Sequence, residues 1–188
     1  NGPAAARGGG SGGSGCDDSR PPNDGGGTDN RTPNDPNDIV GPAGYGPNQA
    51  VSADETLAYT IRFENRVSAT AAARSIVITT KLDDNLDWST FQLGDIAFSN
   101  QFVDVGSATS FFAKRLDLRS TTGVFVDVAA VLDANIGVVT WTLNAIDPAT
   151  GEAPLDPAVG VLPPNEANSI GEGFVTFLIK PRKDSGTG

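Results

Sequence analysis

The chain has 188 residues, a formal net charge of −10 and an isoelectric point near 4.3. An acidic chain repels phosphate backbones, and no stretch interleaves Lys or Arg with aromatic residues, so we expect no nucleic-acid partner. No run of 18 apolar residues occurs, so we also expect no membrane insertion.

The N-terminal 48 residues hold 13 of the 23 glycines and 7 of the 13 prolines, but only one aromatic residue, Tyr45. A segment so poor in apolar side chains cannot bury enough surface to offset the entropy cost of ordering. We therefore predict a flexible or extended Gly/Pro/Asx-rich tail over residues 1–38, a folded domain over 39–183 and a C-terminal tail over 184–188. The chain opens on Asn1 instead of Met, which indicates a processed product or a piece of a longer chain.

The segment that leads into the domain, residues 35–44, is rich in turn-forming residues. Pro42 and Gly44 predict a turn that delivers the chain to the first long strand. The aliphatic pair Ile39 and Val40 is expected to be the first apolar anchor of the domain.

From residue 49 onward, apolar residues alternate with polar ones, which is typical of strands with one buried and one solvated face. Residues 55–65 show the pattern most clearly, with apolar side chains at Leu57, Tyr59, Ile61 and Phe63. Further strands are predicted at residues 75–82, 86–93, 110–118, 124–132, 138–146 and 173–181. The linker of residues 133–137, DANIG, predicts a hairpin between two of these strands.

The long segment 147–173 contains five prolines and four glycines, so we expect it to lack regular structure. β-branched and aromatic residues dominate the predicted strands, and the turns between them are polar. This pattern predicts an all-β sandwich of about seven to nine antiparallel strands.

The composition removes several kinds of catalytic site. The chain has no histidine and only one cysteine, so neither a Ser-His-Asp or Cys-His arrangement nor a common zinc site can form. Cys16 is expected to be a free or intermolecular thiol on the tail. A pair of carboxylates could still hydrolyse a glycosidic bond, but among 23 acidic residues some pair always falls at a suitable separation. We therefore expect a protein that is not an enzyme, with a carboxylate-dependent glycoside hydrolase as an unfavoured alternative.

Calcium is the one cofactor that the sequence favours, because residues 23–38 supply many Asp and Asn oxygens. The best candidate ligands are Asp35, Asn37 and Asp38, which lie next to the first strand. A second candidate cluster is formed by Asp83, Asp84 and Asp87. The alternative explanation is that these residues form turns and solvate a linker.

Two other chemistries deserve consideration on the strands. An intramolecular amide crosslink would need a lysine buried with an asparagine and an acid; the candidates are Lys81, Lys114 and Lys180, although alternation places Lys81 outward. A carbohydrate-binding sandwich would need an aromatic platform, for which the candidates are Trp88, Trp141 and Tyr45. Trp141 lies in an alternating strand and is expected in the core.

Six motifs resemble, in order, a family of conserved-repeat domains of unknown function from large secreted or cell-surface bacterial proteins. The resemblance covers residues 35 to about 182. The motifs are DPNDIVGPAGYG, TLAYTIRFEN, LDDNLDWSTFQLGDIAF, IDPATGEAPLDP, VGVLPPN and GEGFVTF. The resemblance implies an immunoglobulin-like β-sandwich, an extracellular or cell-surface location and neighbouring domains of similar kind. It implies no catalytic residue.

The function expected from these features is that of a non-catalytic structural or adhesive module, with a carbohydrate- or calcium-binding surface module as the alternative. In the family, the chain usually continues beyond the strand that ends in KP into another strand-like segment. A missing strand leaves a sheet edge that invites a strand from elsewhere. Neighbouring domains or identical subunits are therefore the expected partners, and the tail of one copy could lie along the next copy and build a filament. Deleting residues 1–34 is expected to reduce particle size in light scattering.

Overall fold

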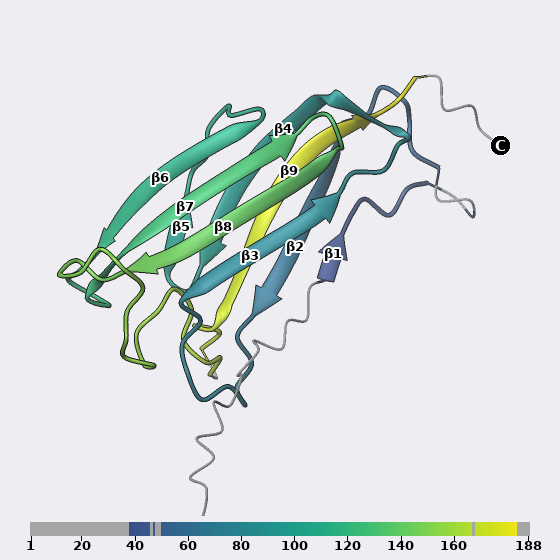
Figure 1. Ribbon diagram of the computed structural model, residues 1–188. Helices are drawn as coiled ribbons and strands as arrows, with labels where there is room; N and C mark the ends of the chain where they lie inside the picture. Colours follow the sequence, from purple (N-terminus) through teal and green to yellow (C-terminus); the bar gives the residue numbers. More distant parts are fainter. Residues whose placement is uncertain (1–37, 46, 48–49, 167, 184–188) are drawn as a thin grey trace, which may run out of the picture. The chain divides into compact units, whose positions relative to one another are not determined.

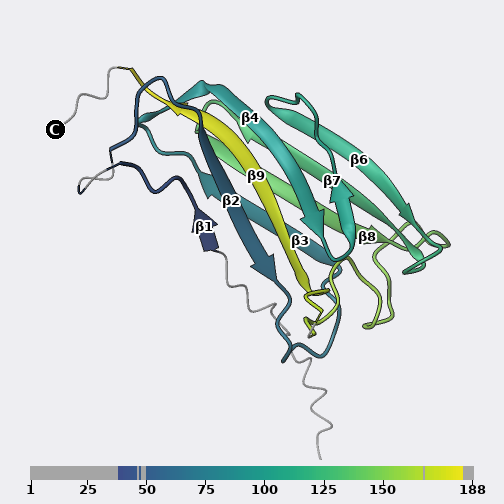
Figure 2. The same ribbon diagram turned by 180° about the vertical axis from the view of Figure 1, so that it is seen from behind.

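The structure is a computed structural model, and it describes residues 38–45, 47, 50–166 and 168–183. These residues form nine strands in two antiparallel sheets, which confirms the predicted all-β sandwich (Figures 1 and 2). The strands are β1 (Asp38–Val40), β2 (Leu57–Glu64), β3 (Ser75–Lys81), β4 (Leu86–Phe98), β5 (Gln101–Val103), β6 (Phe111–Leu118), β7 (Val124–Asp133), β8 (Val138–Ile146) and β9 (Glu172–Pro181). Nothing in the described part of the chain is a helix that could cross a membrane.

The larger sheet has the strand order β1-β2-β9-β4-β5, and the smaller sheet has the order β3-β8-β7-β6. The last strand, β9, lies in the middle of the larger sheet and pairs with β2 on one side and with β4 on the other. The free edges are therefore at β1, β5, β3 and β6, and none adjoins β9. The predicted hairpin joins β7 to β8, and Gly137 N donates to Asp133 O over 2.8 Å in its turn.

The core lies between the inner faces of the two sheets, and the alternation seen in the sequence determines which side chains enter it. Leu57, Ile61 and Phe63 of β2 are buried, as predicted from residues 55–65. Trp141 is fully buried, which confirms its expected place in the core, and its ring lies 6.1 Å from that of Phe177. Such burial of apolar surface is the main stabilising contribution to a sandwich of this kind.

Three features differ from the sequence-based prediction. Strand β4 continues past residue 93 to Phe98. Two register shifts against β9 interrupt the alternation of its side chains, so its full length was not predicted. The short strands β1 and β5 were not predicted as strands. The expectation for Ile39 and Val40 was wrong: their side chains are about half exposed, and β1 is held instead by backbone pairing with β2.

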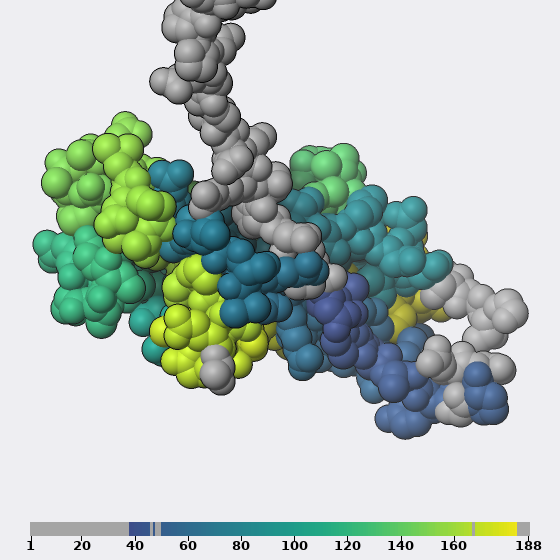
Figure 3. Space-filling view, turned by 90° about the horizontal axis from the view of Figure 1, so that it is seen from below, coloured from purple at the N-terminus to yellow at the C-terminus, as the bar shows by residue number. Residues whose placement is uncertain are grey.

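The long loop after β8 closes one end of the sandwich together with the segment between β2 and β3. Val161 and Leu162 are buried, and Leu162 pairs with Ala73 in an isolated antiparallel bridge. Arg74 Nη1 donates to Pro154 O over 2.8 Å. Figure 3 shows the yellow-green atoms of the loop beside the blue atoms of the segment that follows β2.

Asn65 holds these two segments together from the inside. It is the one buried polar residue among those described, and its Nδ2 donates to Ala71 O and to Leu162 O, each over 3.0 Å. The substitution Asn65→Ala leaves the buried Leu162 carbonyl and the partly buried Ala71 carbonyl without this donor, so we expect it to lower the free energy of unfolding by about 2–3 kcal/mol. Urea denaturation measures the change. The exposed Asn85 provides the control, and an Asn65→Ala change no larger than that of Asn85→Ala would contradict the prediction.

The opposite end is closed by Trp88, which links the two sheets. Trp88 belongs to β4, and its Nε1 donates to Asp83 O over 3.0 Å. Its ring lies against Gly137 in the β7–β8 turn, and Lys81 Nζ sits 4.3 Å from the ring centroid. Trp88 is therefore a half-buried structural contact and not a free aromatic platform.

Candidate binding site on the five-stranded sheet

The outer face of the larger sheet carries a row of side chains that crosses all five strands. In an antiparallel sheet, directly opposed residues point to the same face. Register therefore places Asp38, Arg62, Phe174, Ala97 and Phe102 in one line from β1 to β5. Since Ala97 is small, the row has a low point between two aromatic side chains, and Phe102 is 64% exposed.

The neighbouring row contains two opposed glutamates. Glu64 of β2 lies directly opposite Glu172 of β9, and like charges in this position repel each other. Asn165 Nδ2 donates to Oε1 of both glutamates, over 2.9 Å in each case, so the two Oε1 atoms lie at most about 5.8 Å apart. The long loop positions this amide, because Asn165 N donates to Asn65 O over 2.6 Å and Asn165 Oδ1 accepts from Gly171 N over 3.2 Å.

These two rows border a depression of about 410 Å³ at the end of the sheet. It is lined by Arg62, Phe63, Glu64, Ala97, Phe98, Ser99, Ser169, Glu172, Gly173 and Phe174. The two serines are the only described residues other than glycine with positive φ, at 50° for Ser99 and 56° for Ser169. Such backbone costs on the order of 1–3 kcal/mol and concentrates at ligand sites. Hydrogen bonds to the Glu172 backbone hold both: Ser99 N donates to Glu172 O, and Glu172 N donates to Ser169 O.

The depression combines apolar and polar groups in the way that small-ligand sites do. The carboxylates of Glu64 and Glu172 can accept hydrogen bonds from a ligand, and the Arg62 guanidinium can donate them. Phe174 offers an aromatic surface on which a flat apolar group can pack. The arrangement therefore suits a ligand that carries both hydroxyl groups and apolar faces.

The structure places the predicted aromatic platform residues elsewhere. Trp141 is in the core, Trp88 packs on the β7–β8 turn, and Tyr45 is exposed at its bridge with Ala50. The aromatic residues that do line the outer face, Phe102 and Phe174, were missed. Phe174 follows the Gly171-Glu172-Gly173 segment, and its neighbours across the sheet come from distant parts of the chain. The local sequence therefore gave little sign of an aromatic surface.

Of the three best candidate calcium ligands, Asp35 and Asn37 lie outside the described residues. Asp38 is exposed on β1, and its register neighbour is Arg62, whose positive charge competes with a bound cation. Within the residues described, no three acidic or cysteine side chains gather at a metal-binding distance. Calcium at Asp35, Asn37 and Asp38 stays a prediction from the sequence.

The second acidic cluster is separated by its own hydrogen bonds. Asp83 Oδ1 accepts from Asn85 N over 2.8 Å, and Asp84 pairs with Lys81 over 3.6 Å. The Ser89 hydroxyl donates to Asp87 Oδ1 over 2.6 Å, and this bond lowers the pKa of Asp87. The three carboxylates therefore cap local turns and do not converge on one point.

The three lysines proposed for an amide crosslink are all exposed. Lys81 and Lys180 lie on the strands as expected, and Lys114 of β6 is also at the surface. A spontaneous crosslink needs the lysine to be buried with its partners. The structure therefore contradicts this chemistry at all three positions.

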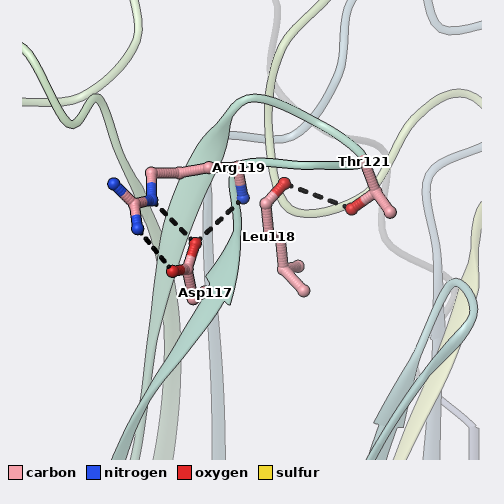
Figure 4. Close-up of polar contacts among 4 residues, drawn as sticks. All are labelled: Asp117, Leu118, Arg119 and Thr121. Carbon is pink, nitrogen blue, oxygen red and sulfur yellow. Dashed lines mark hydrogen bonds and ion pairs between the residues drawn. The ribbon is translucent and has the colours of Figure 1, made fainter.

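A second polar cluster lies on the outer face of the smaller sheet. Asp117 accepts two hydrogen bonds from the Arg119 guanidinium, over 2.9 and 2.8 Å, and one from Arg119 N (Figure 4). Arg115 makes an equivalent two-bond contact with Asp127, over 2.6 and 2.7 Å. Both guanidinium groups also lie within 5.5 Å of the Phe125 ring centroid. These contacts are paired and satisfied, so this cluster is a structural network.

Because both aspartates of this network must be ionised to pair with arginine, we expect the folded protein to lose stability in acid. Hydrogen bonds from Arg119 lower the pKa of Asp117 to about 2, and those from Arg115 lower the pKa of Asp127. A lowered folded-state pKa means that the stabilisation is present above the unfolded value of about 3.9 and is lost as the pH falls toward 2. We therefore expect the melting temperature to be nearly flat above pH 4 and to fall below it.

NMR titration of the carboxyl carbons tests this directly. In Arg119→Gln, the pKa of Asp117 should rise toward its ordinary value, and that of Asp127 should not change. An Asp117 that titrates near pH 4 in the unaltered protein would contradict the prediction.

A family described as a domain of unknown function (DUF7619) matches residues 35–123, which is 89 of the 188 residues. This match agrees with the expected resemblance to a domain of unknown function. No curated protein and no solved structure matches the chain.

Proposed function

We propose that this chain is a non-catalytic adhesive module of a bacterial extracellular or cell-surface protein, and that it binds a neutral glycan at the depression on the five-stranded sheet. The observation that carries the proposal is the pairing of aromatic side chains with a fixed set of hydrogen-bonding groups. Phe174 adjoins Glu64, Glu172 and Arg62 in one depression of about 410 Å³.

The chemistry of a sugar fits these groups. Sugar hydroxyls can donate to the carboxylates of Glu64 and Glu172 and can accept from Arg62, while the Asn165 amide holds the two carboxylates in place. The apolar face of a sugar ring can pack on Phe174, and Phe102 extends the aromatic surface across Ala97. The net charge of −10 disfavours anionic glycans, which is why the proposal is limited to neutral chains.

Two features support an adhesive role at a surface. The six motifs resemble those of a family expected in secreted and cell-surface proteins, and a domain of unknown function matches residues 35–123. A shallow site on a rigid sheet face is suited to contact with a polymer, because successive units of the polymer can continue beyond the depression.

Isothermal titration calorimetry with a panel of neutral oligosaccharides tests the proposal. We expect binding to at least one of them, and we expect Phe174→Ala and Glu172→Gln each to weaken it by about tenfold or more. Phe111→Ala, at an exposed phenylalanine of the smaller sheet, is the matched control and should leave binding unchanged. Absence of binding across the panel, or equal loss in the control, would contradict the proposal.

The close approach of two carboxylates favours a second candidate, the carboxylate-dependent glycoside hydrolase. The shared Asn165 amide limits the distance between the Oε1 atoms of Glu64 and Glu172 to at most about 5.8 Å, a limit that includes the separation of about 5–5.5 Å in retaining enzymes. Both carboxylates accept from the same Asn165 amide, which ties them to one position. We expect no release of reducing ends from the same panel. Release that Glu64→Gln abolishes would replace the binding module with the hydrolase.

A further inference from the structure

Strand β3 is an open edge of the smaller sheet. Ala145 N donates to Arg74 O, and Leu82 N donates to Gly137 O. Because the N–H and C=O groups of successive residues point to opposite sides of a strand, these two bonds show that the groups of the even-numbered residues point toward β8. The backbone groups that point away from β8 belong to Ser75, Val77, Thr79 and Lys81. These groups make no hydrogen bond with any other described residue. β3 therefore offers a ladder of unpaired donors and acceptors.

The other long edge, β6, is protected in a way that β3 is not. Lys114 of β6 lies on the core-facing side of its strand, between the half-buried Phe112 and Leu116. An inward-pointing charge on an edge strand blocks the addition of another strand. The sequence of β3, SIVITTK, has no charge before Lys81 and consists largely of β-branched residues. Of the two long edges, β3 is thus the one suited to pairing.

The described residues also leave a position next to β3 unfilled. Ile39 of β1 lies opposite Ile61, which is buried, so Ile39 faces the core side of its sheet. It is nevertheless 52% exposed. The larger sheet has one strand more than the smaller sheet, and Figures 1 and 2 both show β1 at its margin, beside β2.

Between β2 and β3 lies a depression of about 120 Å³ that is lined in part by Phe63, Ile76 and Leu162. The sandwich is therefore open on this side. One strand added to β3 would extend the smaller sheet over Ile39 and would cover this depression.

The edge already accepts a strand-like partner at one residue. Ala73, just before β3, donates from its N to Leu162 O over 2.8 Å and accepts from Val161 N over 2.8 Å. The long loop then leaves the edge, and from Ser75 onward no described residue pairs with this side of the strand. The local backbone geometry is thus suited to extension of this pairing along β3.

We propose that β3 accepts a single extended segment of a partner polypeptide, which adds as a fifth strand to the smaller sheet. The segment carries apolar residues at alternate positions, which pack on Ile39 and Ile76, and it carries basic residues at its ends. The basic residues complement the net charge of −10 and the acidic Glu64, which lines the depression beside β3.

Residues 1–37 contain no alternating apolar series, so the tail of a second copy does not supply this segment. A single inserted strand also fits the one open position, whereas a second copy would bring a whole sandwich with it. This mode of recognition combines main-chain hydrogen bonds for affinity with alternate side chains for specificity.

Fluorescence anisotropy with a labelled peptide tests the proposal on the full chain. The probe alternates valine with threonine between flanking lysines and has the length of β3, and a second probe carries proline at every other position. We expect the first probe to bind and the second not to bind. Thr79→Pro removes an outward-facing N–H from β3 and should weaken binding by about tenfold or more.

The matched control is Ala113→Pro, which removes an outward-facing N–H from the edge of β6 and should leave peptide binding unchanged. The melting temperatures of both variants establish that they fold. Failure of the first probe to bind, equal binding of the proline probe, or equal loss in both variants would overturn the proposal. So would a concentration-dependent dimer in sedimentation velocity that Thr79→Pro abolishes, because it would assign the edge to a second copy. Glycan binding should be unaffected by Thr79→Pro, so the two proposals can fail separately.

Discussion

Trp141→Ala should lower the free energy of unfolding by about 3–5 kcal/mol. Trp141 is 0% exposed and lies on the central strand β8, where it contacts the Phe177 ring of the opposite sheet. Truncation removes the largest fully buried side chain and leaves a cavity between the two sheets. Guanidinium denaturation measures the change, with an unaltered slope as the sign that unfolding stays cooperative.

The conservative variant Trp141→Phe separates the contribution of volume from that of the indole nitrogen. Among the described residues, Trp141 Nε1 is a buried side-chain polar atom with no hydrogen-bond partner. Phenylalanine loses part of the ring but also removes this unpaired group, so we expect a cost of only about 1–2 kcal/mol. A cost as large as that of the alanine variant would mean that the N–H group is bonded after all.

Gly137→Val is the second large expected effect, with a loss of about 2–5 kcal/mol. Gly137 has a φ of +64°, where a β-branched residue is strained. A Cβ atom there would also overlap with Cζ2 of Trp88, so the indole would have to move away from the turn. Thermal denaturation and near-UV circular dichroism of the Trp88 environment report the change.

Gly151→Val provides the matched control for the backbone contribution. Gly151 has a similar φ of +75°, but nothing lies within 4 Å of a Cβ atom built on it. We therefore expect this variant to show the strain alone, at about 1–2 kcal/mol. Equal losses at Gly137 and Gly151 would mean that the contact with Trp88 contributes nothing.

The sequence predicted the local structure well, because local structure depends on alternation and turn chemistry. The buried face of residues 55–65 and the DANIG turn follow from side chains that are close neighbours along the chain. The place of Trp141 in the core follows from the same period.

The bulges of β4 broke the alternation, and the segment beyond residue 93 could not be assigned from period alone. Strand β1 has only three residues and exposes its apolar pair, so neither length nor pattern indicated it.

The candidate site could not be predicted from the sequence, because it depends on which strands are neighbours in the sheet. Arg62 and Glu64 alternate with the apolar residues of their strand, but nothing local showed that β9 would lie beside them. Only that pairing brings Glu172 opposite Glu64 and puts Phe174 opposite Arg62. The role of Asn165 depends in addition on the path of a loop without regular structure, which no periodicity describes.

The central place of β9 has a consequence for biosynthesis. On the ribosome, β2 and β4 emerge long before the strand that must insert between them, so the larger sheet cannot close until β9 has been translated. The nascent chain therefore exposes two incomplete strand edges and the apolar faces behind them. Contacts that are so distant along the chain also favour slow folding. We expect a chaperone that shields hydrophobic strands to be needed most at that late moment of translation.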